Sequence, residues 1–313
     1  MLTVDKIAVL GLGTMGHGIA QAFAVGGCQV RVYDESTAVR NSVVCRIKEN
    51  LLSAARAGFG GEESIELVLS RVKVCESEAE SVERVQFVVE AIKEDMLVKK
   101  EIFNRIESLV SPDTILASNT SSFPMTQLSS ELKYPQRTVV THWFNPPHIL
   151  PLVEVVPGKK TSSVTIQMTL DLLSQIGKFP VHLKKEIPGF LINRIQIAML
   201  REILDLLDRG VANAKEIDQA VKGSIGLRLA ASGPLEVIDF AGLDVTGSVF
   251  ENLVGEIRSD QQLPTVLKRK IDAGHFGVKA EYGIYQYPPE VVQEQLSRRD
   301  RHFLALKRLL DEH

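Results

Sequence analysis

Three glycines near the N-terminus have the spacing of a loop that binds a dinucleotide. A short apolar strand, Lys6–Leu10, runs directly into Gly11, Gly13 and Gly16 in the pattern GxGxxG, and a helix-like run follows. The first glycine permits a tight turn, the second lets the backbone approach a pyrophosphate, and the third lets the helix lie against the strand. The helix N-terminus then offers unpaired N–H groups and partial positive charge to the phosphates. The pattern therefore predicts a dinucleotide site, and the loop residues expected to contact the ligand are Gly11, Gly13, Thr14, Met15 and Gly16.

A carboxylate about 20 residues further on indicates which dinucleotide the loop binds. Asp34 ends a second predicted strand and is placed to accept hydrogen bonds from the ribose hydroxyls. A carboxylate there would repel a 2′-phosphate, and Glu35 and Ser36 supply no replacement cation. NAD is therefore favoured over NADP, although Arg40, a few residues on, keeps NADP open as an alternative.

A histidine and a glutamate on two later strands have the chemistry of a general base and its partner. His142 ends the predicted strand 138–142, at the carboxyl edge of the sheet, where ligands bind in open α/β folds. Glu154 lies inside the otherwise apolar strand 152–156, where an unpaired carboxylate would be costly. A pair between them would fix the tautomer of the imidazole and raise its basicity, which suits removal of a proton from an alcohol while hydride leaves the same carbon. The alternative is a buried pair with no catalytic role.

The elements that position these residues fall into two parts. Strands and helices alternate to about residue 184, which predicts a doubly wound, mostly parallel sheet of the Rossmann type. Beyond 187 the patterns are helical, which predicts an all-α C-terminal domain. We expect the boundary in the charged and Pro-Gly stretch 184–189, giving a nucleotide-binding domain over 1–186 and a helical domain over 187–313. The helices expected in the second part are 189–207, 215–221, 237–257, 264–273 and 288–310.

Composition excludes several classes of protein. A formal charge of −3 without a dense Lys/Arg run argues against nucleic-acid binding. The three cysteines show neither CxxC spacing nor a Cys/His cluster, so we expect reduced thiols, no metal and a cytoplasmic location. No apolar stretch approaches the roughly 18 residues of a membrane span.

Taken together, these motifs resemble the L-3-hydroxyacyl-CoA dehydrogenase family over nearly the whole chain. The stretches that carry the resemblance are GLGTMG, FVVEAIKED, ASNTSS, HWFNPPHILPLVEVV, KKEIPGFLINR and GPLEVIDFAGLD. The resemblance implies an NAD-binding first domain and a helical second domain that forms a homodimer. It also implies reversible oxidation of the 3-hydroxyl of an acyl-CoA to a ketone by hydride transfer to NAD⁺, a reaction of fatty acid metabolism.

The resemblance also implies roles for individual residues. His142 and Glu154 match the catalytic pair, Ser121 the substrate-contacting serine, and Asn193 the active-site asparagine. Ser121 and Asn193 are neutral groups that could hold substrate oxygens, although each could instead serve a turn or a helix end. The residues that match contacts on the nicotinamide side are Glu94, Lys99, Asn119 and Asn145, with Lys279 in the altered C-terminal motif on the cofactor side. His148, close to His142 in sequence, could line the pocket.

Two departures from the family bear on the substrate. The loop Asn145–Pro151 looks more like relatives that act on free carboxylates, such as gulonate, carnitine and pyridine-carboxylate dehydrogenases. Arg228 lies in a segment longer than its acyl-CoA counterpart and could pair with a substrate carboxylate, or could be a surface residue. We therefore expect a 3-hydroxyacyl-CoA substrate, with a free hydroxy carboxylate as the alternative. A non-catalytic, structural NAD-binding protein is the second alternative.

Overall fold

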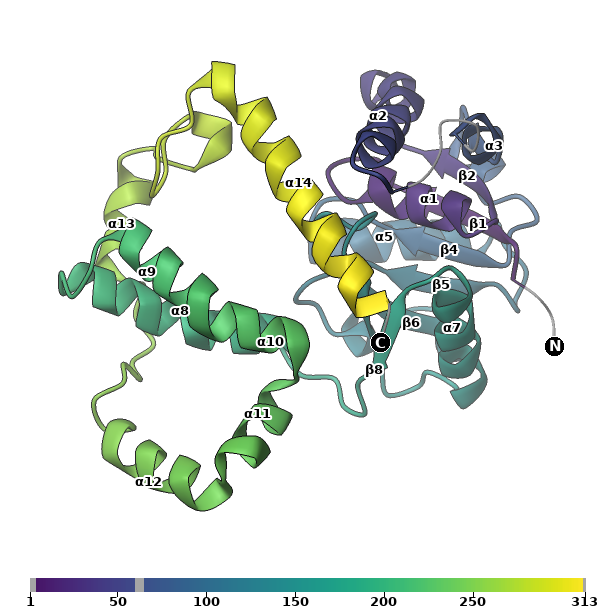
Figure 1. Cartoon of the computed structure of the whole chain (residues 1–313). Coiled ribbons are helices and arrows are strands. Elements are labelled where there is room, and N and C mark those ends of the chain that lie inside the picture. The colour runs from purple at the N-terminus through teal and green to yellow at the C-terminus, as the bar shows by residue number, and fades with distance from the viewer. Residues whose placement is uncertain (1–3, 60–64, 312–313) are drawn as a thin grey trace. The chain divides into compact units, whose positions relative to one another are not determined.

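A computed structural model describes residues 4–59 and 65–311 of the chain. The chain divides into two compact units, Met1–Asn193 and Arg194–His313, which are described separately. The first unit contains an eight-stranded sheet in the order β3-β2-β1-β4-β5-β6-β7-β8 (Figure 1). Its strands are β1 (Lys6–Leu10), β2 (Gln29–Tyr33), β3 (Val72–Val74), β4 (Phe87–Glu90), β5 (Ile115–Ser118), β6 (Thr138–Trp143), β7 (Leu152–Pro157) and β8 (Phe179–His182).

Strands β1 to β6 pair in parallel, whereas β7 pairs antiparallel with β6 and parallel with β8. The last two strands therefore run against the other six. The prediction of a doubly wound, mostly parallel sheet followed by a helical part is confirmed.

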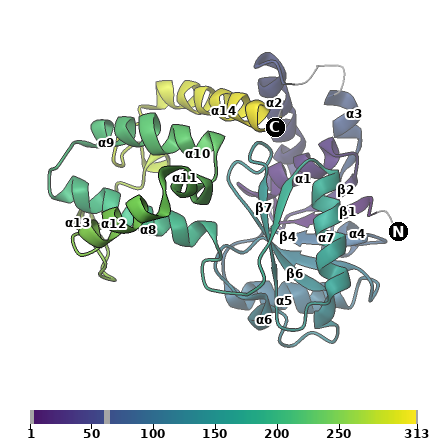
Figure 2. The same ribbon diagram turned by 60° about the horizontal axis from the view of Figure 1, so that its bottom comes forward.

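Helices cover both faces of this sheet (Figure 2). Alternate residues of β1 show why: Ile7 and Val9 belong to one buried cluster, with side chains of α1, α2 and α7, and Ala8 and Leu10 to another, with side chains of α5 and α6. A strand that is buried on both faces needs apolar residues throughout, as β1 has from Ile7 to Leu10. The helices of the first unit are α1 (Gly16–Val25), α2 (Thr37–Arg56), α3 (Ile65–Ser70), α4 (Glu78–Ser81), α5 (Met96–Glu107), α6 (Met125–Leu128), the 3₁₀ turn η2 (Pro135–Arg137) and α7 (Ser163–Gln175).

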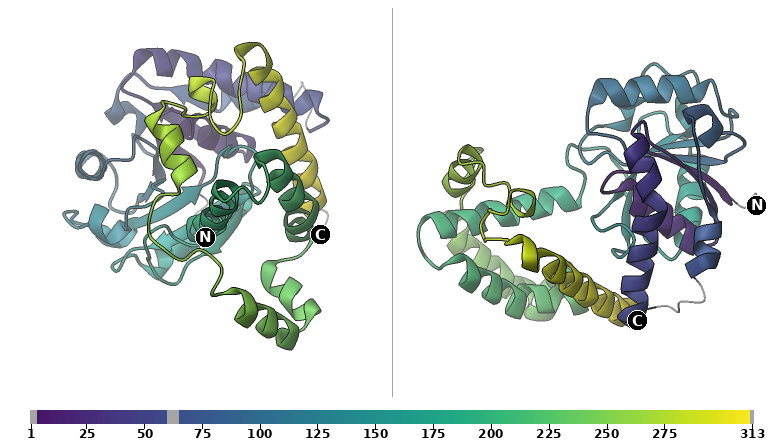
Figure 3. Two further views of the ribbon diagram at one scale, coloured as in Figure 1. Left: turned by 90° about the vertical axis from the view of Figure 1, so that its left-hand side faces the viewer. Right: turned by 90° about the horizontal axis from the view of Figure 1, so that it is seen from above.

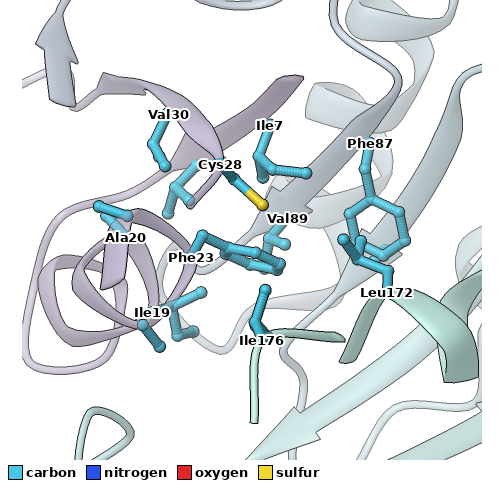
Figure 4. Packing of buried hydrophobic residues seen from close by; sticks show 14 of the residues in the cluster. Ile7, Ile19, Ala20, Phe23, Cys28, Val30, Phe87, Val89, Leu172 and Ile176 are labelled. Atoms are coloured by element: carbon cyan, nitrogen blue, oxygen red, sulfur yellow. The ribbon is translucent and has the colours of Figure 1, made fainter. Parts of the chain in front are cut away.

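Helix α1 packs closely on the sheet, as Figure 4 shows. Phe23 of α1 lies 5.6 Å from the Trp143 ring and 6.3 Å from the Phe87 ring, measured between centroids. Cys28 is buried in the same cluster, and burial raises the pKa of its thiol to about 11. A Cβ on Gly16 would lie 1.7 Å from the carbonyl oxygen of Gly11, so only glycine allows α1 to begin this close to β1. The packing therefore fixes the helix N-terminus beside the glycine loop.

The second unit is helical. Its elements are α8 (Ile192–Asp208), which begins in the first unit, α9 (Ala214–Val221), the π-helical turn η3 (Lys222–Gly226), α10 (Leu227–Ala231), α11 (Pro234–Ala241), α12 (Leu243–Leu253), α13 (Thr265–Asp272), the 3₁₀ turn η4 (Val278–Ala280) and α14 (Pro289–Asp311). The single helix expected over 237–257 is wrong: it is broken at Gly242, whose φ of +93° no helix can contain. Helices α11 and α12 contact each other and extend away from the other helices of the second unit (Figure 3, left).

Burial differs sharply between the units. Every buried hydrophobic side chain of the described residues lies at or before Phe190. The second unit instead exposes large apolar residues on α11 and α12, among them Leu235, Phe240, Leu243 and Phe250, with Phe240 82% exposed. In the described part of the chain, no helix is both long and apolar enough to span a membrane.

Candidate active site

The centre of the site is a hydrogen-bonded histidine–glutamate pair on two neighbouring strands. His142 on β6 and Glu154 on β7 are register partners in the antiparallel ladder, so their side chains leave the same face of the sheet. His142 Nδ1 lies 2.7 Å from Glu154 Oε2, and both side chains are buried. The structure therefore brings the two predicted residues into direct contact.

The second oxygen of Glu154 is also used. Its Oε1 accepts hydrogen bonds from the backbone N–H groups of Leu191, at 3.0 Å, and Ile192, at 2.9 Å, where α8 begins. A carboxylate with these acceptor roles accepts a hydrogen bond from His142 Nδ1–H, which leaves Nε2 as the basic nitrogen of the ring. The rings of Phe144 and Phe190, 4.5 and 5.5 Å away between centroids, confine the imidazole. The orientation and tautomer of His142 are thus set before any ligand arrives.

A cavity of about 580 Å³ in the first unit opens beside this pair. Its walls come from the glycine loop, from the segments after β4 and β5, and from the end of β6. The predicted residues that line it are Gly13, Thr14, Met15, Glu94, Asn119, Ser121, His142, Asn145 and Asn193. Cofactor-side and substrate-side candidates from distant parts of the sequence therefore meet around one space. Among the described residues, no group of three or more His, Cys, Asp or Glu side chains could hold a metal ion.

The glycine loop fits NAD. Gly11 has a φ of +87°, and a Cβ there would lie 2.7 Å from the backbone of Ala91, so the turn requires glycine. A Cβ on Gly13 would meet nothing within 4 Å, so the loop is open on the side where a pyrophosphate must approach. Asp34 directly follows β2 and accepts the backbone N–H of Leu12 at 2.7 Å. Arg40 donates to the Asp34 carbonyl oxygen at 2.6 Å, and it lies 3.8 Å from Glu76 as well, so it does not compensate for Asp34 as a 2′-phosphate partner.

Ser121 and Asn193 meet on the other side of the cavity. Asn193 Nδ2 donates to the carbonyl oxygen of Ser121 at 3.2 Å. The backbone N–H of Ser121 donates to Glu94 Oε1 at 3.0 Å, and its hydroxyl lies 3.4 Å from the same oxygen. Asn119 Oδ1 accepts the backbone N–H of Trp143 at 3.0 Å, which ties the β5 edge to the β6 edge.

Lys99 lies behind this wall and does not line the cavity. Its side chain is 1% exposed, and its ammonium contacts Glu90 at 2.7 Å and Glu94 at 3.4 Å. Burial raises the pKa of Glu90. Burial also acts to raise the pKa of Glu94, but hydrogen bonds from Thr120 and its neighbours, with the charge of Lys99, outweigh it and lower that pKa. Sequence reasoning missed Glu90, although a carboxylate in an apolar strand was the signal that singled out Glu154.

Sequence reasoning also missed Lys178, which is buried like Lys99. Lys178 Nζ donates to the carbonyl oxygens of Pro147, at 2.7 Å, and Leu150, at 2.9 Å, and lies over the Trp143 ring. It thereby anchors the loop between β6 and β7. His148 in that loop packs toward α1, its ring 6.5 Å from that of His17.

Two of the predicted site residues, Arg228 and Lys279, lie in the helical unit. Arg228 lies on α10, exposed, and donates to the Ser224 hydroxyl at 3.3 Å. Its segment is helical, continuous with the π-helical turn before it. Lys279 Nζ lies 5.3 Å from the centre of the Phe276 ring. Their roles toward cofactor or substrate remain predictions.

Comparison with known proteins adds two family matches and several full-length relatives. Residues 6–187 match the 3-hydroxyacyl-CoA dehydrogenase NAD binding domain, and residues 189–287 match the C-terminal domain of the same family. The chain is 36% identical to 5-formyl-3-hydroxy-2-methylpyridine 4-carboxylate 5-dehydrogenase of Mesorhizobium japonicum, over 98% of this chain and 99% of that protein. It is 35% identical to a probable 3-hydroxybutyryl-CoA dehydrogenase of Bacillus subtilis, over 91% of this chain and 98% of that protein.

Solved structures give the same two kinds of relative. A crystal structure of 5-formyl-3-hydroxy-2-methylpyridine 4-carboxylic acid 5-dehydrogenase, described as an NAD⁺-dependent dismutase, superimposes with a TM-score of 0.91 at 34% identity and covers 99% of both chains. The (S)-3-hydroxybutyryl-CoA dehydrogenase of Ralstonia eutropha superimposes with a TM-score of 0.74 at 32% identity, covering 91% of this chain and all of that one.

Proposed function

Because the chain belongs to the 3-hydroxyacyl-CoA dehydrogenase family, we propose that His142 and Glu154 are the catalytic pair of its oxidation reaction. The family membership, the NAD cofactor and the assignment to NAD-dependent oxidoreductases acting on CH–OH groups are confirmed. The observation that carries the proposal is the 2.7 Å contact between His142 and Glu154 at the wall of the cavity that the glycine loop also lines.

The pair acts by moving one proton. His142 Nε2 removes the proton of the substrate hydroxyl in the oxidation direction and returns it in the reduction direction. Glu154 stabilises the imidazolium that forms, since its carboxylate stays hydrogen-bonded to Nδ1–H. Bound NAD⁺ supplies the hydride acceptor. Ser121 and Asn193 hold the substrate oxygens without adding charge near the developing ketone.

The cofactor contacts follow from the same arrangement. The glycine loop and Asp34 hold the adenosine end and the pyrophosphate, with Glu94, Asn119 and Asn145 on the nicotinamide side. Lys99 supports Glu94 from behind, as their 3.4 Å contact indicates. His148 and Lys279 stay proposed contacts of substrate and cofactor respectively.

For the substrate we favour a small hydroxy carboxylate or a hydrated formyl carboxylate. The support is the pyridine-carboxylate relative, whose likeness spans 99% of both chains and so includes α14, which lies beyond the family match that ends at 287. Arg46 of α2, a cation that could otherwise pair with a CoA phosphate, donates to the Leu12 carbonyl oxygen at 2.6 Å. In this proposal Arg228 pairs with the substrate carboxylate. The second candidate is an L-3-hydroxyacyl-CoA, supported by the family itself and by the 3-hydroxybutyryl-CoA relatives.

The helical unit is proposed to form a homodimer. Its large apolar side chains, such as Phe240, are exposed to a degree that is unusual for a monomer, and a second copy would bury them. We propose that the boundary between the nucleotide-binding domain and the helical domain falls between residues 186 and 187. A cytoplasmic location is supported by Cys28, Cys45 and Cys75, all of which are free thiols.

The test is NADH formation from NAD⁺ with two sets of substrates. One set is L-3-hydroxybutyryl-CoA, and the other is a panel of free acids with gulonate, carnitine and 5-formyl-3-hydroxy-2-methylpyridine 4-carboxylate. Turnover of a free acid, lost on substituting Arg228→Met, would support the first candidate. Turnover of the thioester alone would replace it by the second. NADH binding without turnover of any hydroxy compound would favour the non-catalytic alternative.

A further inference from the structure

Two carboxylates share one buried ammonium directly behind the cavity wall. Glu90 ends β4 with its side chain 0% exposed, and Lys99 of α5 donates to its Oε1 at 2.7 Å. The same ammonium lies 3.4 Å from Glu94, which is 36% exposed and reaches the cavity. The charges thus run from the core of the sheet to the wall of the site, through Lys99.

Both carboxylates hold the polar segment that follows β5. Glu90 Oε2 accepts the hydroxyl of Ser118 at 2.6 Å, and that hydroxyl in turn accepts the backbone N–H of Thr120 at 3.2 Å. Glu94 Oε1 accepts the Thr120 hydroxyl at 2.6 Å and the Ser121 N–H at 3.0 Å. The Thr120 hydroxyl in turn accepts the backbone N–H groups of Ser122 and Phe123, so the conformation of residues 118–123 depends on where the two carboxylates lie.

Because Lys99 and Glu90 are both buried, the position of Glu90 determines where the Lys99 ammonium lies. An ammonium that is 1% exposed cannot turn to water. Its further partner, the Ile92 carbonyl oxygen at 3.5 Å, is neutral, so loss of the Glu90 charge drives the ammonium toward Glu94. Without the charge of Glu90, Lys99 would move to Glu94 and draw that carboxylate away from the Ser121 N–H. We infer that Glu90 is a positioning residue: through Lys99 and Ser118 it sets Glu94, and thereby the position in which Ser121 faces the cavity. The catalytic part of this inference rests on the proposed role of Ser121.

The first test needs no substrate. Glu90→Gln keeps the size of the side chain and removes its charge. Hydrogen exchange of the whole protein, followed by mass spectrometry, should show residues 118–123 exchanging roughly tenfold faster or more, the scale of losing a hydrogen bond to a charged group.

The matched control is Glu107→Gln. Glu107 is also largely buried, pairs with Arg137 at 3.6 Å and accepts the Lys133 N–H at 2.8 Å, but lies outside the site. It should leave exchange of residues 118–123 unchanged. Wild-type exchange of this segment in a folded Glu90→Gln variant, or equal acceleration in the control, would overturn the inference. If Glu90→Gln does not fold, Ser118→Ala removes a single link of the chain and must accelerate exchange at Thr120; unchanged exchange there also refutes it.

A double-mutant cycle then tests the route through Ser121. Glu90→Gln should lower kcat in the wild-type background and have little further effect in Ser121→Ala, because residues that act through one another are not additive. Additive losses would show that Glu90 does not act through Ser121. If Ser121→Ala alone has wild-type turnover, the proposed role of Ser121 fails, and the exchange experiment still decides whether Glu90 holds the segment.

Discussion

Replacing Glu154 by glutamine tests the proposed chemistry most directly. The two oxygens of Glu154 accept N–H donors from His142, Leu191 and Ile192. A glutamine has only one oxygen. If that oxygen keeps the two backbone donors of α8, the amide NH₂ must face His142 Nδ1 and donate to it. The imidazole then carries its proton on Nε2, where it can no longer accept one from the substrate.

The expected loss of turnover is large. General base catalysis contributes about 10²–10⁴-fold, so Glu154→Gln should lower kcat by roughly that factor. The loss of a hydrogen bond to a charged group should also lower the free energy of unfolding by ~1.5–3 kcal/mol. NADH affinity should stay near that of the wild type, because the glycine loop and Asp34 are untouched.

The assay is NADH absorbance for kcat, fluorescence titration for NADH affinity and urea unfolding for stability. His142→Ala is the parallel variant, and it should lose turnover by about 10² or more with NADH affinity retained. A folded Glu154→Gln variant with kcat within about threefold of the wild type would refute the assignment of Glu154 as the group that orients the base.

Four further outcomes follow from particular structural features. Gly13→Ala should leave the melting temperature unchanged, since its Cβ meets nothing within 4 Å, yet weaken NADH binding by roughly tenfold or more because the pyrophosphate needs that space. Gly16→Ala, whose Cβ would lie 1.7 Å from a backbone oxygen, should instead destabilise the fold by ~1–3 kcal/mol or more in urea unfolding. At pH 8 a thiol reagent should label only the exposed Cys45 rapidly, with the other two cysteines reacting after denaturation; rapid labelling of all three in the folded protein would contradict their burial. Phe240→Asp should convert the proposed dimer to a monomer by light scattering, whereas Leu97→Asp, on an equally exposed residue of the first unit, should not.

The sequence predicted the sheet and the central pair for physical reasons that do not depend on distant context. Strands buried on both faces must be apolar throughout, so the carboxylate in β7 needed a partner, and the structure places Glu154 against His142. The glycine loop could also be predicted from neighbouring residues alone. A side chain at Gly11 or Gly16 would collide with the backbone, so these positions require glycine.

The features that sequence reasoning missed depend on side-chain contacts and backbone conformations that an apolar pattern does not report. Glu90 and Lys99 are nine residues apart, and only the fold shows that the Lys99 ammonium contacts the carboxylates of both Glu90 and Glu94. The helix expected over 237–257 failed at Gly242, where an apolar pattern continues across a residue with positive φ. Periodicity reports which side chains are apolar and is silent about the backbone between them.

The antiparallel pairing of β6 with β7 separates what must stay constant from what can change. The pair of ladder residues keeps base and carboxylate in register whatever connects the two strands. The connection, residues 144–151, is anchored at its base by Lys178 and borders the same cavity through Phe144 and Asn145. If the pair has its proposed role, this loop can be exchanged to change the cavity wall while the histidine and the glutamate that move the proton keep their register.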